Sequence, residues 1–305
     1  MLQAVKNWFI RRSVNPAGWD AVSATRWHYC PPKKLTPLEQ YKLEHPDRAL
    51  LVVKGSCILN NDGLFEQCAI ARSTEFPQLV KGQYPPYAET LLIVGSGLSA
   101  KPFLNEIRGH EGPIMSIKGA HDWLMENGIT PTYAVAADPQ ESRHNCFKRL
   151  NDETIYLVAS QMHPKTWDYL KGRKVIIWHA QINQEQTKLP DWLGIPLIPG
   201  GGTTGLRSLP LAWVMGFRNV ETYGLDSVID PDGTYKLDGS KKIERDTVRK
   251  VWIGDKEFLS TDLLVSQTQG LMGTLQCLPG IKVVAHGEGL FQEVLKQGKA
   301  AGWPV

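Results

Sequence analysis

The stretch Leu91-Leu-Ile-Val-Gly-Ser-Gly-Leu-Ser-Ala100 joins a short apolar run to a glycine-rich turn. The apolar run predicts a buried strand, and the glycines predict a sharp turn from which a helix begins. Because a helix N-terminus offers unpaired N–H groups and a positive dipole end, such a turn can hold a phosphate. The GxGxxA spacing also fits a dinucleotide-binding variant. The alternative is a tight strand-to-helix turn without a ligand.

Six further apolar runs follow the same pattern, each separated from the next by a longer mixed segment: 113–117, 133–137, 155–159, 174–178, 220–223 and 281–285. Continuously apolar strands alternating with helical segments are typical of a parallel sheet covered on both faces. We expect helices near 101–109, 121–127 and 206–215, the last two closed by glycines. The sequence therefore predicts an α/β, Rossmann-like, mostly parallel sheet with helices on both faces.

Residues 1–88 differ from the rest because they are rich in proline and turns. We predict a small N-terminal accessory segment over 1–88 and a Rossmann-like nucleotide-binding domain over 89–305. The first 40 residues are basic and carry interleaved tryptophans, which predicts either a nucleic-acid surface or a small segment packed on the main domain. Residues 229–258 are polar and predict a surface hairpin or a lid.

The composition is that of an ordinary globular protein, with 305 residues, 42% of them hydrophobic and 21% charged. The net charge of +3 suits an anionic ligand. No apolar run approaches the roughly 20 residues that span a bilayer, and no secretory signal is apparent, so we expect a cytoplasmic protein without a membrane partner. The five cysteines are widely spaced and form no CxxC pair, which argues against a disulfide framework or a structural zinc site.

Polar residues follow several predicted strands, at the sheet edge where open parallel sheets bind ligands. The second strand ends at Lys118 rather than at the acidic residue that an NAD site needs, which leaves an NADP oxidoreductase as a minor alternative. Asp138 follows the third strand and suits a divalent metal, a ribose, an acceptor hydroxyl or a helix cap. His163 follows the fourth strand and His179 ends the fifth, and both are candidates for acid–base roles.

A second glycine-rich turn, Pro199-Gly-Gly-Gly-Thr-Thr-Gly-Leu206, precedes another predicted helix. Consecutive glycines are costly unless the backbone must adopt positive φ or approach a ligand closely. We therefore predict an anion site at Gly201, Gly202, Thr203, Thr204 and Gly205; it is not a Walker A loop because no Gly-Lys-Ser/Thr follows. Asp226 ends the next strand, and Asp138 and Asp226 together predict a Mg²⁺ site.

Five motifs in order carry a resemblance to a known family: Ile93-Val-Gly-Ser-Gly-Leu-Ser99, Asn127-Gly-Ile-Thr-Pro-Thr-Tyr133, Ala137-Asp-Pro139, Gly201-Gly-Thr-Thr-Gly205 and Tyr223-Gly-Leu-Asp226. Together they resemble the 6-hydroxymethylpterin diphosphokinase (MptE-like) family and the related motility-accessory flagellin glycosyltransferases, over roughly residues 89–290. The family's pterin members move diphosphate from ATP with Mg²⁺, and its glycosyl members move a sugar from a CMP donor. Lys118 stands where the family often has Asn, which leaves the donor open.

The resemblance implies a Rossmann-like transferase with a nucleotide donor, such as ATP or a CMP-sugar, and a hydroxyl-bearing acceptor. Its donor-phosphate turn would be formed by Gly95, Ser96, Gly97 and Ser99. Independently of the resemblance, a lysine at position 118 could contact a phosphate of the donor. Asp138, Asp226, His163 and His179 are the candidate catalytic residues. Diphosphate transfer is our first expectation, glycosyl transfer the second, and a non-catalytic nucleotide- or nucleic-acid-binding protein the third. The acceptor and the oligomeric state stay open.

Overall fold

The computed structural model describes residues 13–14, 59–80, 86–183, 186, 189, 192, 195–200, 203–239, 248–300 and 302. The basic first 40 residues, apart from 13–14, and the predicted anion-site residues Gly201 and Gly202 lie outside the described residues.

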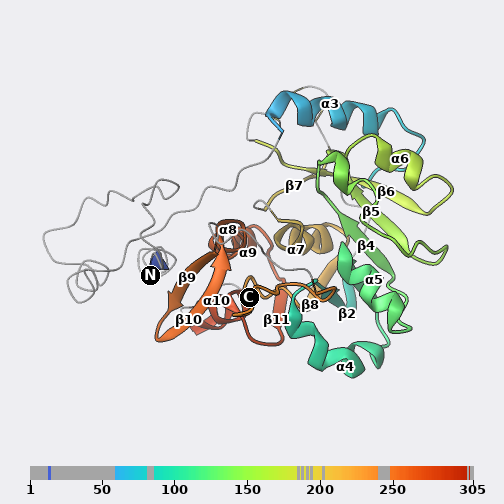
Figure 1. Cartoon of the computed structure of the whole chain (residues 1–305). Coiled ribbons are helices and arrows are strands. Elements are labelled where there is room, and N and C mark those ends of the chain that lie inside the picture. The colour runs from blue at the N-terminus through green and yellow to red at the C-terminus, as the bar shows by residue number, and fades with distance from the viewer. Residues whose placement is uncertain are drawn as a thin grey trace, which may run out of the picture.

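Eight parallel strands form the main sheet, in the order β11-β8-β2-β3-β4-β5-β6-β7. They are β2 (Tyr87–Val94), β3 (Ile114–Ile117), β4 (Tyr133–Ala136), β5 (Ile155–Ala159), β6 (Val175–Ala180), β7 (Leu197–Ile198), β8 (Phe217–Tyr223) and β11 (Lys282–Ala285). Each predicted apolar run contributes a strand, because a strand buried on both faces needs continuous apolar sequence. The predicted Rossmann-like α/β fold is confirmed (Figure 1).

The chain reverses direction across the sheet at β2. From β2 it steps outward through β3 to β7, then returns through α7 (Thr204–Val214) to β8 on the other side of β2. The junction between β2 and β8 is therefore a topological switch point, the usual ligand position in an open α/β sheet.

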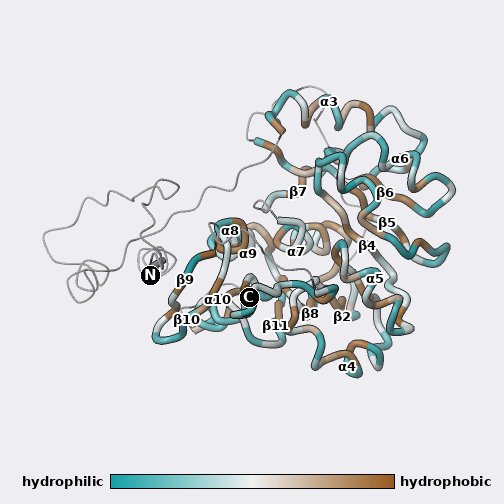
Figure 2. The backbone as a smooth tube through the Cα atoms, in the orientation of Figure 1, coloured by the Kyte–Doolittle hydropathy of each residue, from teal (hydrophilic) through white to brown (hydrophobic). Residues whose placement is uncertain are grey.

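Helices cover both faces, as the alternation of side chains along β2 shows. Leu92 and Val94 belong to the core cluster that contains Ile107 and Leu124, whereas Ile93 belongs to the cluster of the opposite face, which contains Leu206. The first face carries α3 (Asn61–Arg72), η2 (Leu98–Phe103), α4 (Leu104–Arg108), α5 (Gly119–Glu126) and α6 (Lys165–Tyr169). The second carries α7, α8 (Asp262–Gln269), α9 (Leu271–Gln276) and α10 (Leu290–Ala300). Figure 2 shows apolar residues concentrated along the central strands.

Part of the predicted N-terminal segment packs directly on the sheet. Ala71 of α3 lies in the core cluster formed with β4, β5, β6 and α6. Beyond α3, the Leu79 N–H donates to Ile177 O of β6 at 2.7 Å, and Ile177 N–H donates to Pro77 O at 2.8 Å. Residues 61–79 are thus in contact with the domain that we predicted to begin at residue 89.

The polar excursion at 229–258 contains an antiparallel hairpin. Its strands are β9 (Val248–Ile253) and β10 (Lys256–Thr261), and β1 (Ser13–Val14) pairs with β9 to complete a small sheet. Before the hairpin, Leu237 donates its N–H to Ser96 O at 2.8 Å and is only 8% exposed, so this segment lies over the turn after β2. Among the described helices, none is long and apolar enough to cross a membrane.

Candidate functional site

The turn after β2 packs tightly against the turn after β8. Gly95 N–H donates to Tyr223 O at 2.7 Å, and Gly97 N–H donates to Gly224 O at 2.9 Å. A Cβ atom on Gly95 would overlap Gly224 O, and Gly224 itself has a φ of +66°. Glycine is therefore required here by the close approach of two protein backbones.

Asp226 occupies donors of the turn that we predicted to hold a phosphate. Its carboxylate accepts hydrogen bonds from the Ser99 N–H at 2.9 Å, from the Ser99 hydroxyl and, more weakly at 3.4 Å, from Gln292 Nε2. The side chain is 4% exposed, and this burial raises the pKa of Asp226, an effect that the Ser99 hydrogen bonds partly offset. A protein carboxylate thus satisfies the donors of Ser99.

The second glycine-rich turn lies at the same edge of the sheet. Thr203 caps α7 by accepting from the Leu206 N–H at 3.2 Å, and its hydroxyl donates to Gln267 Oε1 at 2.7 Å. Thr204 is buried, and Gly205 lies against Leu225. The two predicted anion turns do not face each other across open space, because the Leu225 side chain lies within 2.6 Å of a Cβ placed on Gly95 and 3.1 Å of one on Gly205.

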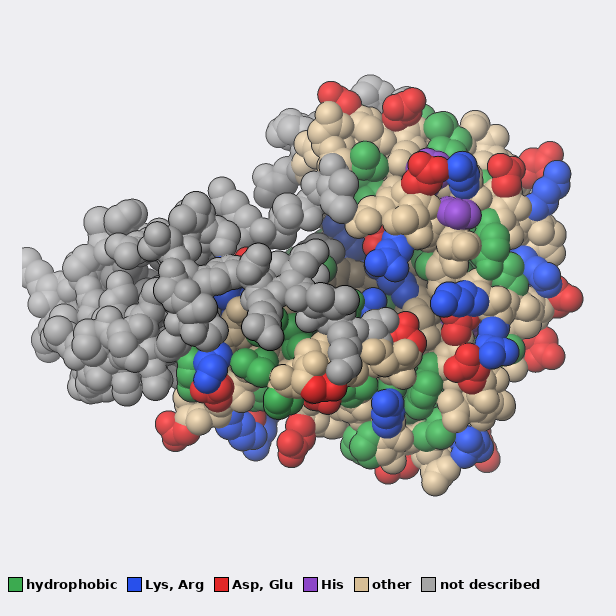
Figure 3. Space-filling model, in the orientation of Figure 1, with side chains coloured by type: hydrophobic (Ala, Val, Ile, Leu, Met, Phe, Trp, Pro, Cys, Tyr) green, Lys and Arg blue, Asp and Glu red, His purple; other side chains and the backbone are tan. Residues whose placement is uncertain are grey.

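Lys118, at the end of β3, has an unusual backbone. Its φ is +49° and its ψ is −121°, a conformation that favours glycine. Its ammonium group pairs with Asp138 Oδ2, after β4, at 3.2 Å, and the two side chains are 35% and 19% exposed. Figure 3 shows Lys and Arg side chains gathered in a hollow between the part that carries α3 and α6 and the part that carries β8 and β11.

Asp138 and Asp226 are not brought together. They follow β4 and β8, which are separated by β2 and β3, so three strand spacings of about 4.8 Å place them about 14 Å apart. Mg²⁺ contacts its ligands at about 2 Å. Because Asp138 is paired with Lys118 and Asp226 with Ser99, these two carboxylates do not fit a shared Mg²⁺ site.

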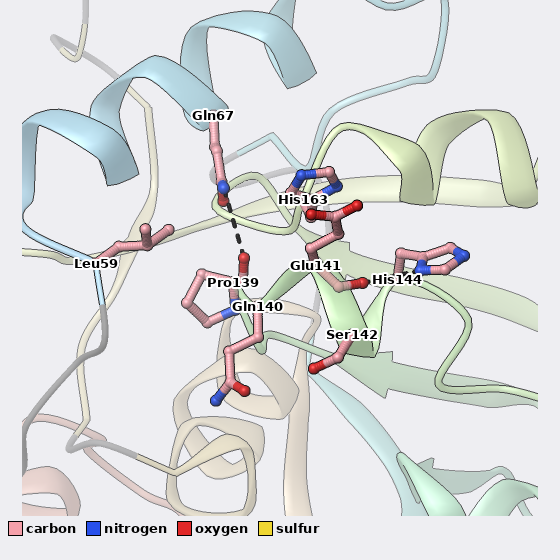
Figure 4. Close-up of a pocket in the computed structure, with 8 residues that line it drawn as sticks. All are labelled: Leu59, Gln67, Pro139, Gln140, Glu141, Ser142, His144 and His163. Atoms are coloured by element: carbon pink, nitrogen blue, oxygen red, sulfur yellow. Dashed lines mark hydrogen bonds between the residues drawn. The ribbon is translucent and has the colours of Figure 1, made fainter.

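An open pocket of about 750 Å³ lies between α3 and η3 (Glu141–Arg143) (Figure 4), and its lining residue Gln140 donates its N–H to Asp138 Oδ1 at 3.3 Å. Gln67 points from α3 toward Pro139 and donates to Pro139 O at 3.4 Å. The lining residues are mostly polar: Leu59, Gln67, Pro139, Gln140, Glu141, Ser142, His144 and His163. The pocket therefore adjoins the residue after Asp138 at the carboxyl edge.

Two histidines line this pocket with opposite hydrogen-bonding patterns. His163 Nδ1 accepts from the Lys165 N–H at 3.3 Å, which assigns the proton of the neutral ring to Nε2. His144 Nδ1 lies 2.8 Å from the Glu141 carbonyl, to which it must donate, so the neutral ring keeps its lone pair on Nε2. His163 was a predicted catalytic residue. His144 was not chosen, although its place after Asp138 signalled it.

His179 lies apart from the pocket, in the core. It is fully buried, with Nε2 3.0 Å from Gln78 Oε1 and its ring edge-on to Trp192. Burial, together with the nearby Arg72 guanidinium, lowers the pKa of His179 to about 4. The ring is therefore neutral near pH 7, and this geometry suits a packing role better than proton transfer.

Comparisons with known proteins agree with this architecture. A family model described as "6-hydroxymethylpterin diphosphokinase MptE-like" matches residues 66–232. Among solved structures, the Maf glycosyltransferase from Magnetospirillum magneticum AMB-1 has a similar fold, with a TM-score of 0.58 and 14% sequence identity over 83% of this chain. This chain spans only 41% of the length of that glycosyltransferase. No curated protein sequence matches the chain.

Proposed function

The chain belongs to the 6-hydroxymethylpterin diphosphokinase MptE-like family, and from that premise we propose that it is a transferase. It binds a nucleotide donor over the carboxyl ends of β3 and β4 and passes a group to a hydroxyl-bearing acceptor. The likeness in fold to a glycosyltransferase supports this assignment at the level of architecture.

The backbone of Lys118 is the observation that carries the proposal. A lysine at φ +49° costs of order 1–3 kcal/mol, and such outliers cluster at active sites. Glycine would avoid this cost, which arises from the Cβ atom, so we infer that the lysine side chain has a role at this position that offsets the strain. Held by Asp138 at the carboxyl edge, the ammonium group is placed to bind the donor phosphate.

We favour glycosyl transfer over diphosphate transfer from ATP. Diphosphate transfer relies on Mg²⁺ to neutralise the phosphates, and the Asp138–Asp226 pair predicted to hold the ion is separated. Glycosyl transfer needs one cationic group beside the leaving phosphate and one base. The carboxyl edge of the sheet offers Lys118 as the cation and His144 as the base.

The proposed reaction is a single displacement. The acceptor oxygen forms a bond to the sugar's anomeric carbon, while the bond from that carbon to the donor phosphate oxygen breaks. The phosphate leaves with the electron pair, and the Lys118 ammonium group stabilises its charge. The acceptor's proton goes to His144 Nε2, whose lone pair is left available by the bond from Nδ1 to Glu141 O.

The test is turnover of CMP-sugars and of ATP with Mg²⁺, followed by chromatographic detection of CMP or AMP. We expect CMP, and we expect Lys118→Ala to weaken donor binding about 10- to 100-fold, since a hydrogen bond to a charged group contributes about 1.5–3 kcal/mol. Lys171→Ala, at an exposed position, is the matched control. AMP formation would instead show that the protein transfers diphosphate from ATP, and the absence of both CMP and AMP would refute the proposal.

A further inference from the structure

Two glutamine side chains hold the loop that follows β4. Gln161, just after β5, donates from Nε2 to Ala137 O at 3.1 Å. Gln67 of α3 donates from Nε2 to Pro139 O at 3.4 Å (Figure 4). These two carbonyls belong to the residues on either side of Asp138. Two elements that are distant in the sequence therefore fix the stretch of backbone that carries the Asp138 carboxylate.

The hydrogen bond from Gln161 lies where the strand ladder has ended. The last pair between β4 and β5 joins Ala136 to Val158, so Ala137 lies one residue beyond it. Backbone carbonyls in a protein interior need a donor, and here a side chain supplies one. Gln161 is 8% exposed, and its Oε1 has no partner in the described part of the chain. The carboxamide therefore acts on the protein through the N–H that it donates.

The held loop in turn fixes the carboxylate of Asp138. Pro139 restricts the backbone of the residue before it. The Asp138 Oδ1 atom accepts from the Gln140 N–H at 3.3 Å, and Oδ2 accepts from Lys118 Nζ at 3.2 Å. A partly exposed ion pair usually contributes little, because two flexible side chains must be ordered to form it. A carboxylate that is already fixed by its surroundings loses less freedom on pairing.

We propose that Gln161 and Gln67 are positioning residues of the donor site. They hold the Asp138 loop so that its carboxylate keeps the Lys118 ammonium group at the carboxyl edge of the sheet. Each glutamine acts through Asp138 and has no contact with the donor. Gln161 contributes more than Gln67, because its hydrogen bond is shorter and buried. The inference rests on the proposed function, in which Lys118 binds the donor phosphate.

The experiment compares Gln161→Met and Gln67→Met in the full chain, because methionine is unbranched and flexible like glutamine but has no N–H donor. Calorimetric titration measures the binding of CMP, which keeps the phosphate of the proposed donor. Gln161→Met should weaken CMP binding about fivefold, the typical effect of one hydrogen bond, and Gln67→Met should weaken it less. In a Lys118→Ala background, Gln161→Met should change CMP binding less than about twofold, because the carboxylate then has no ammonium group to hold.

Gln292 supplies a matched control at another part of the sheet edge. It is also 8% exposed, donates from Nε2 to His286 O at 3.0 Å and more weakly to Asp226 Oδ1 at 3.4 Å, and has an Oε1 without a partner among the described residues. It lies in α10, which follows β11, on the other side of β2 from β4. Gln292→Met should therefore bind CMP like the parent, while urea unfolding shows a loss of stability comparable to that of Gln161→Met.

Amide hydrogen exchange at Gln140 reports on the Asp138 carboxylate without any donor, since this N–H donates to Oδ1. Gln161→Met should speed this exchange about fivefold, and Gln292→Met should leave it unchanged. Three results would overturn the inference: unchanged exchange in Gln161→Met, unchanged CMP affinity in Gln161→Met, or an equal loss of affinity with and without Lys118. A parent protein that does not bind CMP would instead refute the proposed function, and the exchange rates alone would then decide whether Gln161 holds Asp138.

Discussion

Lys118 offers a direct test of whether strain is stored at the candidate site. Lys118→Gly and Lys118→Ala both remove the ammonium group and its 3.2 Å pair with Asp138. Only the glycine variant also relieves the backbone, because an alanine keeps the Cβ atom that makes a φ of +49° unfavourable. The two variants therefore lose the same ion pair and differ in strain.

The magnitude follows from two opposing effects. Relief of an outlier of this kind is worth about 2 kcal/mol, the middle of the expected range. Against this, glycine lowers the free energy of unfolding by about 0.7 kcal/mol relative to alanine, because it increases the conformational entropy of the unfolded chain. The difference leaves Lys118→Gly more stable than Lys118→Ala by about 1.3 kcal/mol, even though both have lost the ammonium group.

Urea unfolding followed by tryptophan fluorescence measures both variants. Lys171 supplies a control pair, since its φ is not positive and glycine there should be less stable than alanine. The order of the two substitutions should therefore reverse between positions 118 and 171. If Lys118→Gly proves equal to or less stable than Lys118→Ala, the strain argument and the functional inference drawn from it both fail.

Three further predictions concern the core and the edge of the sheet. Gly95→Ala should destabilise the protein by about 3 kcal/mol because its Cβ meets backbone atoms, whereas Gly273→Ala, with open space on α9, should stabilise it by about 0.5–1 kcal/mol; denaturant titrations compare them. His179 has a pKa of about 4 in the folded protein and 6.5 in the unfolded chain. Below pH 6.5 the unfolded chain therefore binds one more proton, and the free energy of unfolding falls by about 3 kcal/mol toward pH 4. Unfolding measured at a series of pH values should show a smaller loss in His179→Gln. Asp226 has a raised pKa, so the parent protein should lose stability as pH rises above 3.8, and this loss should be absent in Asp226→Asn, measured in the same pH series.

The fold was predictable because parallel strands buried on both faces leave continuous apolar runs that few other structures produce. Every run that we predicted as a strand contributes to the sheet, and the predicted helices at 101–109, 121–127 and 206–215 overlap α4, α5 and α7. Residues 61–79 were harder to place, since their packing depends on Ala71 and Leu79 meeting distant strands. Local sequence carries no signal for such contacts.

The site was only partly predictable, because one residue pattern serves two physical purposes. Glycines at 95 and 97 satisfy the requirements of a phosphate turn, but they equally satisfy the close approach of the Gly224 backbone. The sequence could not show that Asp226 would hydrogen-bond to Ser99 from across the chain. It placed Lys118, Asp138 and His163 at the carboxyl edge because strand ends can be inferred from apolar runs, whereas the pairing of Lys118 with Asp138 needed the strand order.

These contacts shift the expected position of the donor phosphate away from the switch point. Between β2 and β8, the Leu225 side chain fills the space beside Gly95. The Asp226 carboxylate accepts the hydrogen bonds of Ser99, and Leu237 lies over Ser96. An incoming anion would have to displace a buried carboxylate there. One and two strands further along, Lys118 and Asp138 keep their charged groups partly exposed next to an open pocket. A donor therefore meets less competition over β3 and β4, so loss of Lys118 should impair donor binding more than loss of the Ser99 hydroxyl.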